Sequence, residues 1–158
     1  MAPMSQQKQK LSMKNLNLLE MVSAGRILIW VDDKLNPENR AIMEAAERQG
    51  VSVLLAKSTT DALAKFDSLG DVKHYPQSHL RIISNMTRKE GEEYNTKAGL
   101  DFAQKIRKMQ YVGPILIFCG NVDKAKQEMA QEHLVTITNE TAVAQNYACF
   151  QQVKSHDF

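Results

Sequence analysis

The sequence predicts an α/β fold: a five-stranded, parallel, doubly wound sheet in an α/β/α sandwich, with an extra N-terminal helix. First, short continuous apolar runs such as residues 27–31 and 114–119 have the length and composition of strands buried on both faces of a parallel sheet. Second, segments with helical start and stop signals separate these runs. Each strand–helix unit is about as long as a right-handed crossover requires, so parallel pairing follows.

The bulk properties indicate one globular domain and exclude several function classes. The 158 residues are 43% hydrophobic and 24% charged, and the net charge of +2 favours neither nucleic acid nor an anionic membrane as a partner. The apolar runs are too short to span a bilayer. Cys119 and Cys149 lie in apolar runs without metal or redox spacing, which indicates buried thiols in a reducing compartment. We therefore expect a cytoplasmic protein with no membrane contact.

The chain divides into three parts. Residues 1–10 are polar and rich in Gln and Lys, and Leu11, Leu18, Leu19 and Val22 follow at roughly helical spacing. We predict an N-terminal arm and helix over 1–24, the main domain over 25–153 and a short tail over 154–158. The apolar side of the early helix would pack on the domain or on a second copy of the chain, and the sequence leaves both open. Little chain follows the last helix, so output is expected through the surface of this domain or through the arm.

The first strand–helix unit has the clearest signals. After the strand Ile27–Val31, Asn36 is placed to cap a helix over 36–49, Pro37 takes its first position, and Gly50 ends it. The other expected elements are a strand at 51–56, a helix from Ser58 to Phe66 or Leu69, a polar loop at 71–78, a strand at 80–84, a charged loop from Thr87 to Tyr94, a helix from about 97 to 109, a strand at 114–119, a helix at 122–133, a strand at 134–138 and a helix at 141–152.

Several residues with polar or small side chains lie at or just after the carboxyl ends of the predicted strands, where doubly wound sheets bind ligands. These residues are the candidate site: Asp32, Asp33, Asn85, Cys119, Gly120, Thr138 and Asn139.

A strand that ends in Asp32-Asp33 and continues into a helix resembles the first unit of response-regulator receiver domains, which have a CheY-like, flavodoxin-like fold. The similarity covers about residues 26–150, close to a whole receiver. In that family the acidic pair holds Mg²⁺ and the third strand ends in a phosphoacceptor Asp. The fourth strand ends in Thr or Ser followed by a small residue, and the fifth ends near a Lys.

The chain departs from that pattern at several positions. Asn85 falls where the phosphoacceptor should be, and an amide is a poor nucleophile toward phosphorus. Cys119 falls at the Thr/Ser position, where its thiol is a weak hydrogen-bond donor, while Gly120 fits the small position. Residues 137–140 offer no Lys to neutralise a phosphoryl group, and the fifth strand lacks the expected switch aromatic.

These departures predict a non-phosphorylatable pseudo-receiver, a binding module rather than an enzyme. Its expected role is protein interaction or regulatory signalling, with a protein partner that the sequence does not identify and a homodimer as an alternative. No nucleic acid and no cofactor are expected. Asp32 and Asp33 have two interpretations: a weak Mg²⁺ site, or a turn that leads into the next helix.

Two other functions stay open. One is a small flavodoxin-like enzyme that processes a nucleotide or NAD, similar in outline to TIR domains, with Glu90, Glu92 or Glu93 as its acid. The turn after the first strand opposes it, because no glycine occurs there before Gly50 to form a phosphate loop. The other is an atypical receiver that uses a displaced acid such as Asp32.

The stretch between Asn85 and Gly99 is several residues longer than in an ordinary receiver. We expect residues 88–94 to lie over or beside the site, as a lid, a partner contact or a solvated insertion.

Overall fold

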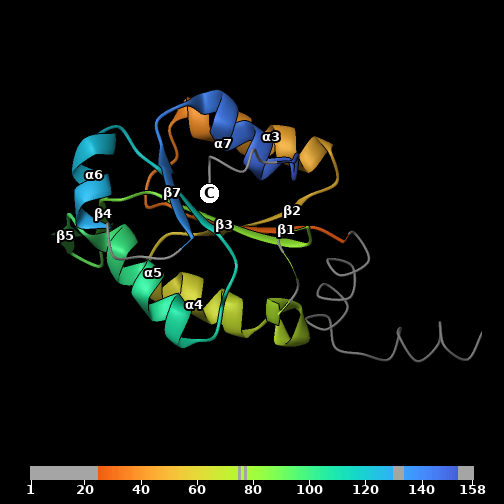
Figure 1. The fold of residues 1–158 in the computed structure, drawn as a ribbon, viewed down its shortest axis with the longest axis horizontal. Coiled ribbons are helices and arrows are strands. Elements are labelled where there is room, and N and C mark those ends of the chain that lie inside the picture. The colour runs from red at the N-terminus through yellow and green to blue at the C-terminus, as the bar shows by residue number, and fades with distance from the viewer. Residues whose placement is uncertain (1–24, 75, 77, 130–133, 153–158) are drawn as a thin grey trace, which may run out of the picture.

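A computed structural model describes residues 25–74, 76, 78–129 and 134–152 of the chain (Figure 1). The predicted N-terminal arm and helix and the predicted tail lie outside the described residues. One parallel sheet runs through the centre in the order β2-β1-β3-β6-β7, which confirms the predicted five-stranded, doubly wound fold. Its strands are β1 (Ile27–Val31), β2 (Ser52–Ala56), β3 (Leu80–Ser84), β6 (Ile115–Phe118) and β7 (Val135–Thr138).

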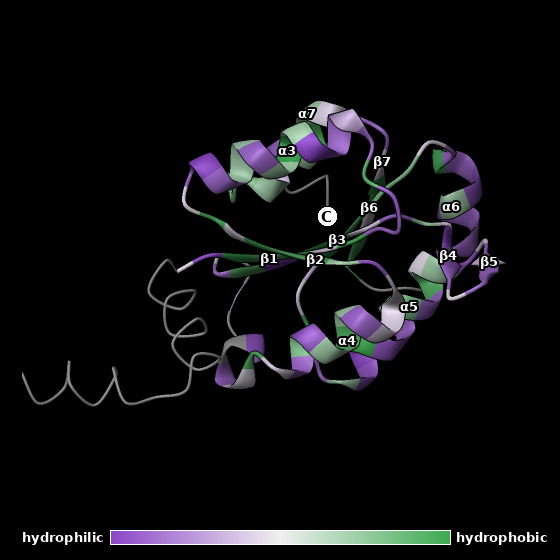
Figure 2. Cartoon of the chain, turned by 180° about the vertical axis from the view of Figure 1, so that it is seen from behind, coloured by the Kyte–Doolittle hydropathy of each residue, from purple (hydrophilic) through white to green (hydrophobic). Residues whose placement is uncertain are grey.

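Helices cover both faces of the sheet. Helices α3 (Pro37–Arg48) and α7 (Thr141–Ala148) lie together on one face. The other face carries α4 (Thr59–Asp67), α5 (Ala98–Lys108) and α6 (Val122–Glu128). The apolar strands are therefore enclosed between two polar-faced layers (Figure 2). None of the helices in the described part of the chain is long and apolar enough to cross a membrane.

Local signals explain where the elements begin. All five residues of β1 are buried, because β2 and β3 pair with its two edges and helices cover both faces of the sheet. The Asn36 side chain accepts a hydrogen bond from the backbone of Asn39 at 2.7 Å and caps α3, with Pro37 in its first turn. Ser58 caps α4 in the same way through the backbone N–H of Asp61 at 3.0 Å. These predicted starts are confirmed.

The later helices end earlier than predicted. Helix α6 ends at Glu128 rather than at residue 133, and residues 130–133 lie outside the described part. Helix α7 ends at Ala148 rather than at residue 152, because Phe150 adopts a left-handed backbone with φ +58°. The predicted polar loop begins with a short 3-10 helix, η1 (Gly70–His74).

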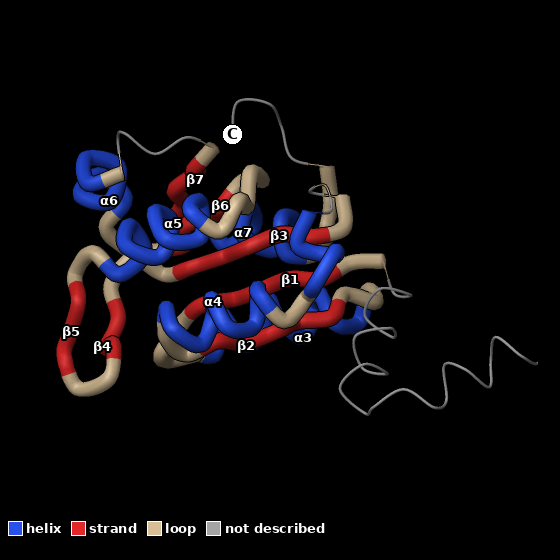
Figure 3. The backbone as a smooth tube through the Cα atoms, turned by 90° about the horizontal axis from the view of Figure 1, so that it is seen from below, coloured by secondary structure: helices blue, strands red, loops and turns tan. Residues whose placement is uncertain are grey.

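The prediction of a charged loop from Thr87 to Tyr94 is wrong, because this segment forms a β-hairpin. Strand β4 (Arg88–Glu90) pairs antiparallel with β5 (Glu93–Asn95), and the hairpin stands beside the central sheet as a separate unit (Figure 3). Gly91 takes φ +65° in the turn between the two strands. The segment is not simply a solvated insertion either, because Arg88 at its base is fully buried.

Candidate functional site

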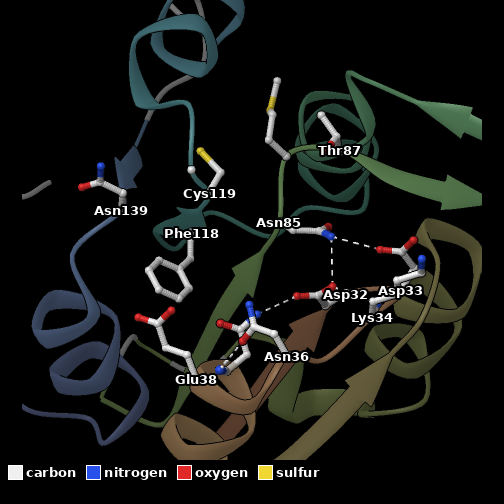
Figure 4. Close-up of a pocket in the computed structure, with 13 residues that line it drawn as sticks. Asp32, Asp33, Lys34, Asn36, Glu38, Asn85, Thr87, Phe118, Cys119 and Asn139 are labelled. Carbon is white, nitrogen blue, oxygen red and sulfur yellow. Dashed lines mark hydrogen bonds between the residues drawn. The ribbon is translucent and has the colours of Figure 1, made fainter.

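A cleft of about 420 Å³ opens at the carboxyl edge of the sheet (Figure 4). Parallel strands bring their ends to this edge, so residues distant in sequence meet there. The lining residues are Asp32, Asp33, Lys34, Asn36, Glu38, Asn39, Asn85, Met86, Thr87, Phe118, Cys119, Gly120 and Asn139.

Asp32 lies directly after β1 and is buried. Its carboxylate accepts hydrogen bonds from the backbone of Lys34 at 3.0 Å and from the Asn39 amide at 3.1 Å. Burial raises the pKa of Asp32, the charge of Asp33 acts in the same direction, and hydrogen bonds from Lys34, Trp30 and Asn39 oppose the rise. The Asp32 carboxylate therefore stabilises the turn after β1 through Lys34 and also lines the cleft.

Asn85 bridges the two acidic side chains. Its Nδ2 donates to Asp32 Oδ1 at 3.1 Å and to Asp33 Oδ1 at 3.3 Å (Figure 4). The second oxygen of Asp33 accepts from the backbone N–H of Lys89 in the hairpin at 2.9 Å. The predicted pair and the predicted phosphoacceptor position are therefore brought together, and they are joined by an amide.

Arg88 is the main component of the site that the sequence analysis missed. Its side chain is fully buried and donates through Nη1 to Asn85 Oδ1 at 2.7 Å and to Ser84 Oγ at 3.0 Å. Nη2 donates to Thr59 Oγ1 at 2.7 Å, and Nε donates to Glu90 at 2.6 Å. Burial lowers the pKa of Arg88, and the neighbouring Glu90 opposes that change.

Glu90 joins the hairpin to α4. Its carboxylate accepts from the backbone N–H of Thr59 at 3.0 Å and from the Thr59 hydroxyl at 2.7 Å, while also pairing with Arg88. Burial acts to raise the pKa of Glu90, but the hydrogen bonds from Thr59 and Arg88 outweigh it and lower the pKa. Glu90 therefore stays ionised at neutral pH and holds the first turn of α4.

The helix that follows the hairpin also approaches the site closely. The backbone N–H of Gly99 donates to Met86 O at 2.8 Å, and a Cβ at Gly99 would lie 2.7 Å from Asn85 O. Only glycine fits this contact, which explains its position at the start of α5.

The other predicted residues line the cleft only in part. Cys119 and Gly120 are lining residues, and burial raises the pKa of the Cys119 thiol, which therefore stays protonated at neutral pH. Thr138 is not a lining residue, since its hydroxyl accepts from the backbone of Glu140 at 3.0 Å. Asn139, the next residue and also a predicted site residue, does line the cleft.

Other cleft residues carried little signal in the sequence. Asn39 sits in the buried side of α3, and Phe118 ends a strand in which every residue is apolar. For Arg88, nothing in a charged stretch of seven residues separates the buried cation from its exposed neighbours.

The residues present do not fit a magnesium ion between Asp32 and Asp33. Mg²⁺ prefers several hard oxygen ligands, whereas the third group here presents N–H donors to both carboxylates. A buried cation, Arg88, already supplies positive charge at this edge. Within the described residues there is no group of three or more His, Cys, Asp or Glu side chains placed to hold a metal, and no buried side-chain nitrogen or oxygen lacks a partner.

No protein-family model matches the sequence, and no curated protein matches it. Solved structures match it well in shape. The chain has a receiver-like fold. A response regulator receiver domain protein from Clostridium thermocellum is 23% identical, with 78% of this chain and 94% of that chain covered and a TM-score of 0.54.

Two further structures show the same receiver-like fold. The chemotaxis response regulator CheY4 of Vibrio cholerae is 18% identical, with 76% of this chain and 92% of that chain covered and a TM-score of 0.52. A sensor protein from Polaromonas sp. JS666 is 13% identical, with 78% and 92% covered and a TM-score of 0.53. At these identities the likeness establishes the fold.

Proposed function

We propose that this protein is a regulatory module with a receiver-like fold that is not switched by phosphorylation and acts through contact with a protein. The observation that carries the proposal is the Asn85 amide, which donates to Asp32 and Asp33 from the end of β3. A phosphoacceptor needs an anionic oxygen there, and an amide that donates to two carboxylates supplies none.

The rest of the edge supports the same proposal. The protonated Cys119 thiol is a weak donor for a phosphoryl oxygen, and the Thr138 hydroxyl is engaged with its own turn. The fifth strand is followed by Asn139 and Glu140, so no lysine stands at its end.

An enzymatic role gains no support from the loop glutamates. Glu90 is bound to Thr59 and Arg88 and does not line the cleft. Glu92 and Glu93 are exposed in the hairpin and are not lining residues either. We therefore expect no release of nicotinamide when the protein is incubated with NAD.

The experiment uses the full chain with acetyl phosphate or beryllofluoride and Mg²⁺. We expect no mass increase by one phosphoryl group, and no beryllofluoride-dependent shift of backbone amide resonances around Asn85. An aspartate-containing receiver domain treated in parallel controls for the reagents. A phosphorylated product on the wild-type chain, at Asp32 or elsewhere in the cleft, would overturn the proposal.

The protein partner is tested first as a second copy of the chain. Sedimentation velocity over a range of concentrations measures self-association directly. A concentration-dependent dimer identifies the partner as another copy. A monomer at all concentrations directs the search to a different protein, which is sought by cross-linking at the native concentration.

A further inference from the structure

The hairpin places three consecutive residues against three parts of the site. Arg88 contacts Asn85, the backbone N–H of Lys89 donates to Asp33, and Glu90 holds Thr59 at the start of α4. The extra residues of this chain are thus built into the carboxyl edge of the sheet.

Arg88 decides which way the Asn85 amide points. A guanidinium group only donates hydrogen bonds, so the Asn85 atom that faces Nη1 at 2.7 Å has to be the oxygen. The NH₂ group then faces Asp32 and Asp33, both of which only accept when ionised. A half-turn of the amide would place N–H against guanidinium and oxygen against two carboxylates, and every one of these contacts would become repulsive.

Burial makes this arrangement difficult to change. Arg88 is fully enclosed, and its guanidinium is held by Ser84, Thr59 and Glu90 in addition to Asn85. It also donates to the backbone carbonyl of Ala98 at 3.3 Å, where α5 begins. Moving the guanidinium aside would leave several buried acceptors without a donor.

We propose that Arg88 is a positioning residue that, through the Asn85 amide, keeps a divalent cation out of the Asp32–Asp33 pair. This inference rests on the proposed function and gives a physical reason for the poor fit of a metal at the acidic pair. The amide nitrogen takes the bridging place between the two carboxylates, and the guanidinium supplies positive charge behind it. The hairpin stabilises this arrangement because it carries Arg88 and because the backbone N–H of Lys89 donates to Asp33.

The test is a Mg²⁺ titration of the full chain, followed by the fluorescence of Trp30 and by amide resonances. Trp30 is the single tryptophan and is buried in β1, two residues before Asp32, so its fluorescence reports on this end of the strand. The variants are Asn85→Asp, Arg88→Met and the two combined. Arg81→Met is the matched control, because Arg81 is also a buried arginine of the β3 region and lies outside the cleft.

We expect no saturable response to millimolar Mg²⁺ from the wild type or from Arg81→Met. Asn85→Asp alone adds a third carboxylate to the cleft, but that carboxylate forms an ion pair with Arg88. The affinity of this variant for Mg²⁺ therefore stays weak. The combined variant binds Mg²⁺ about tenfold more tightly than Asn85→Asp, because it keeps the carboxylate and loses the competing cation. Arg88→Met alone releases the Asn85 amide, whose oxygen can then face the carboxylates, so this variant should gain a saturable response to Mg²⁺. No response from Arg88→Met, or equal affinities of the combined variant and of Asn85→Asp, would overturn the inference.

A second variant covers the case in which Arg88→Met does not fold. Arg88→Lys keeps the charge but cannot contact Ser84, Thr59 and Asn85 at once. With Asn85 left in place, Arg88→Lys should bind Mg²⁺ more tightly than the wild type because the amide is no longer held, and an unchanged affinity would contradict a positioning role. Phosphorylation of the wild type tests the proposed function, whereas these affinities test Arg88, so the two failures are distinguishable.

Discussion

Two buried arginines lie within and just beyond the same central strand, β3, and they are held in different ways. Arg81, the second residue of β3, donates to the backbone carbonyl of Tyr147 at 2.9 Å. Its guanidinium carbon lies 4.9 Å from the centre of the Tyr147 ring and 4.8 Å from that of Phe150. Arg88, four residues beyond the end of β3, is held by Glu90 and by the side chains of the site.

The comparison shows that one residue type can be buried for two purposes. Arg81 joins the sheet to the end of α7 through a carbonyl and two aromatic faces, which is a packing role. Arg88 joins the hairpin, α4 and the cleft through side-chain acceptors, and it orients one of the cleft residues. Burial alone would not separate these roles, because it lowers the pKa of both arginines.

The largest expected effect is that of Arg88→Met on stability. The substitution removes the ion pair with Glu90, which keeps its donors from Thr59, and leaves Asn85 Oδ1 without its Arg88 donor. Breaking a pair whose arginine is fully buried costs about 3 kcal/mol. Urea unfolding at neutral pH measures the loss. A change below about 1 kcal/mol would show that the Arg88 network contributes little and would remove the contrast with Arg81.

Arg81→Met is expected to cost less, about 1 to 2 kcal/mol. Methionine keeps much of the packing against Tyr147 and Phe150, and the interactions lost include the hydrogen bond to Tyr147 O and two cation–π contacts. The same unfolding experiment measures it. A loss larger than that of Arg88→Met would reverse the comparison.

Glu90→Gln is expected to cost about 1 kcal/mol at neutral pH, because a charge-assisted pair with Arg88 becomes a neutral hydrogen bond. The pKa of folded Glu90 lies below its ordinary value of 4.5. Its stabilising contribution is therefore present above pH 4.5 and is lost as the pH falls through the folded pKa.

The difference in unfolding free energy between the wild type and Glu90→Gln should accordingly shrink on acidification from about pH 7 to about pH 3. Asp32, whose pKa is raised, is present in both proteins and cancels from this difference. If the difference in unfolding free energy between the two proteins stayed constant with pH, the charge of Glu90 would not contribute to the attachment of the hairpin. Arg81→Met, tested in parallel, should show no such narrowing.

The smallest expected effect is that of Tyr94→Ala, also in the hairpin. Tyr94 is 67% exposed and donates to the Thr87 hydroxyl at 2.8 Å. We expect a stability change within about 0.5 kcal/mol, because the hairpin is attached through Arg88 and Glu90 rather than through this ring. A loss of stability as large as that of Arg88→Met would show that the Tyr94 side chain, and not only Arg88 and Glu90, attaches the hairpin to the domain.

Local rules in the sequence predicted most of the fold. The apolar run Ile27–Val31 has the length and composition of a strand buried on both faces, and Asn36 followed by Pro37 is a local start signal for a helix. The structure supplies the reason for a glycine at position 99, because a Cβ there would meet Asn85 O. The helix ends at Glu128 and Ala148 were missed because periodicity continues past the last bonded turn.

By itself, the sequence determined the chain order of the helices and of the five strands of the central sheet, and the residue types at the ends of those strands, including the amide at Asn85. Only the tertiary structure decided which atoms of those residues face one another. In the sequence, Arg88 is one charged residue in a polar stretch. In the folded protein, acceptors from Thr59, Ser84 and Asn85 surround its guanidinium. The physical reason is that a buried charge is tolerated only where several distant groups converge on it, and such convergence leaves no local pattern in the chain.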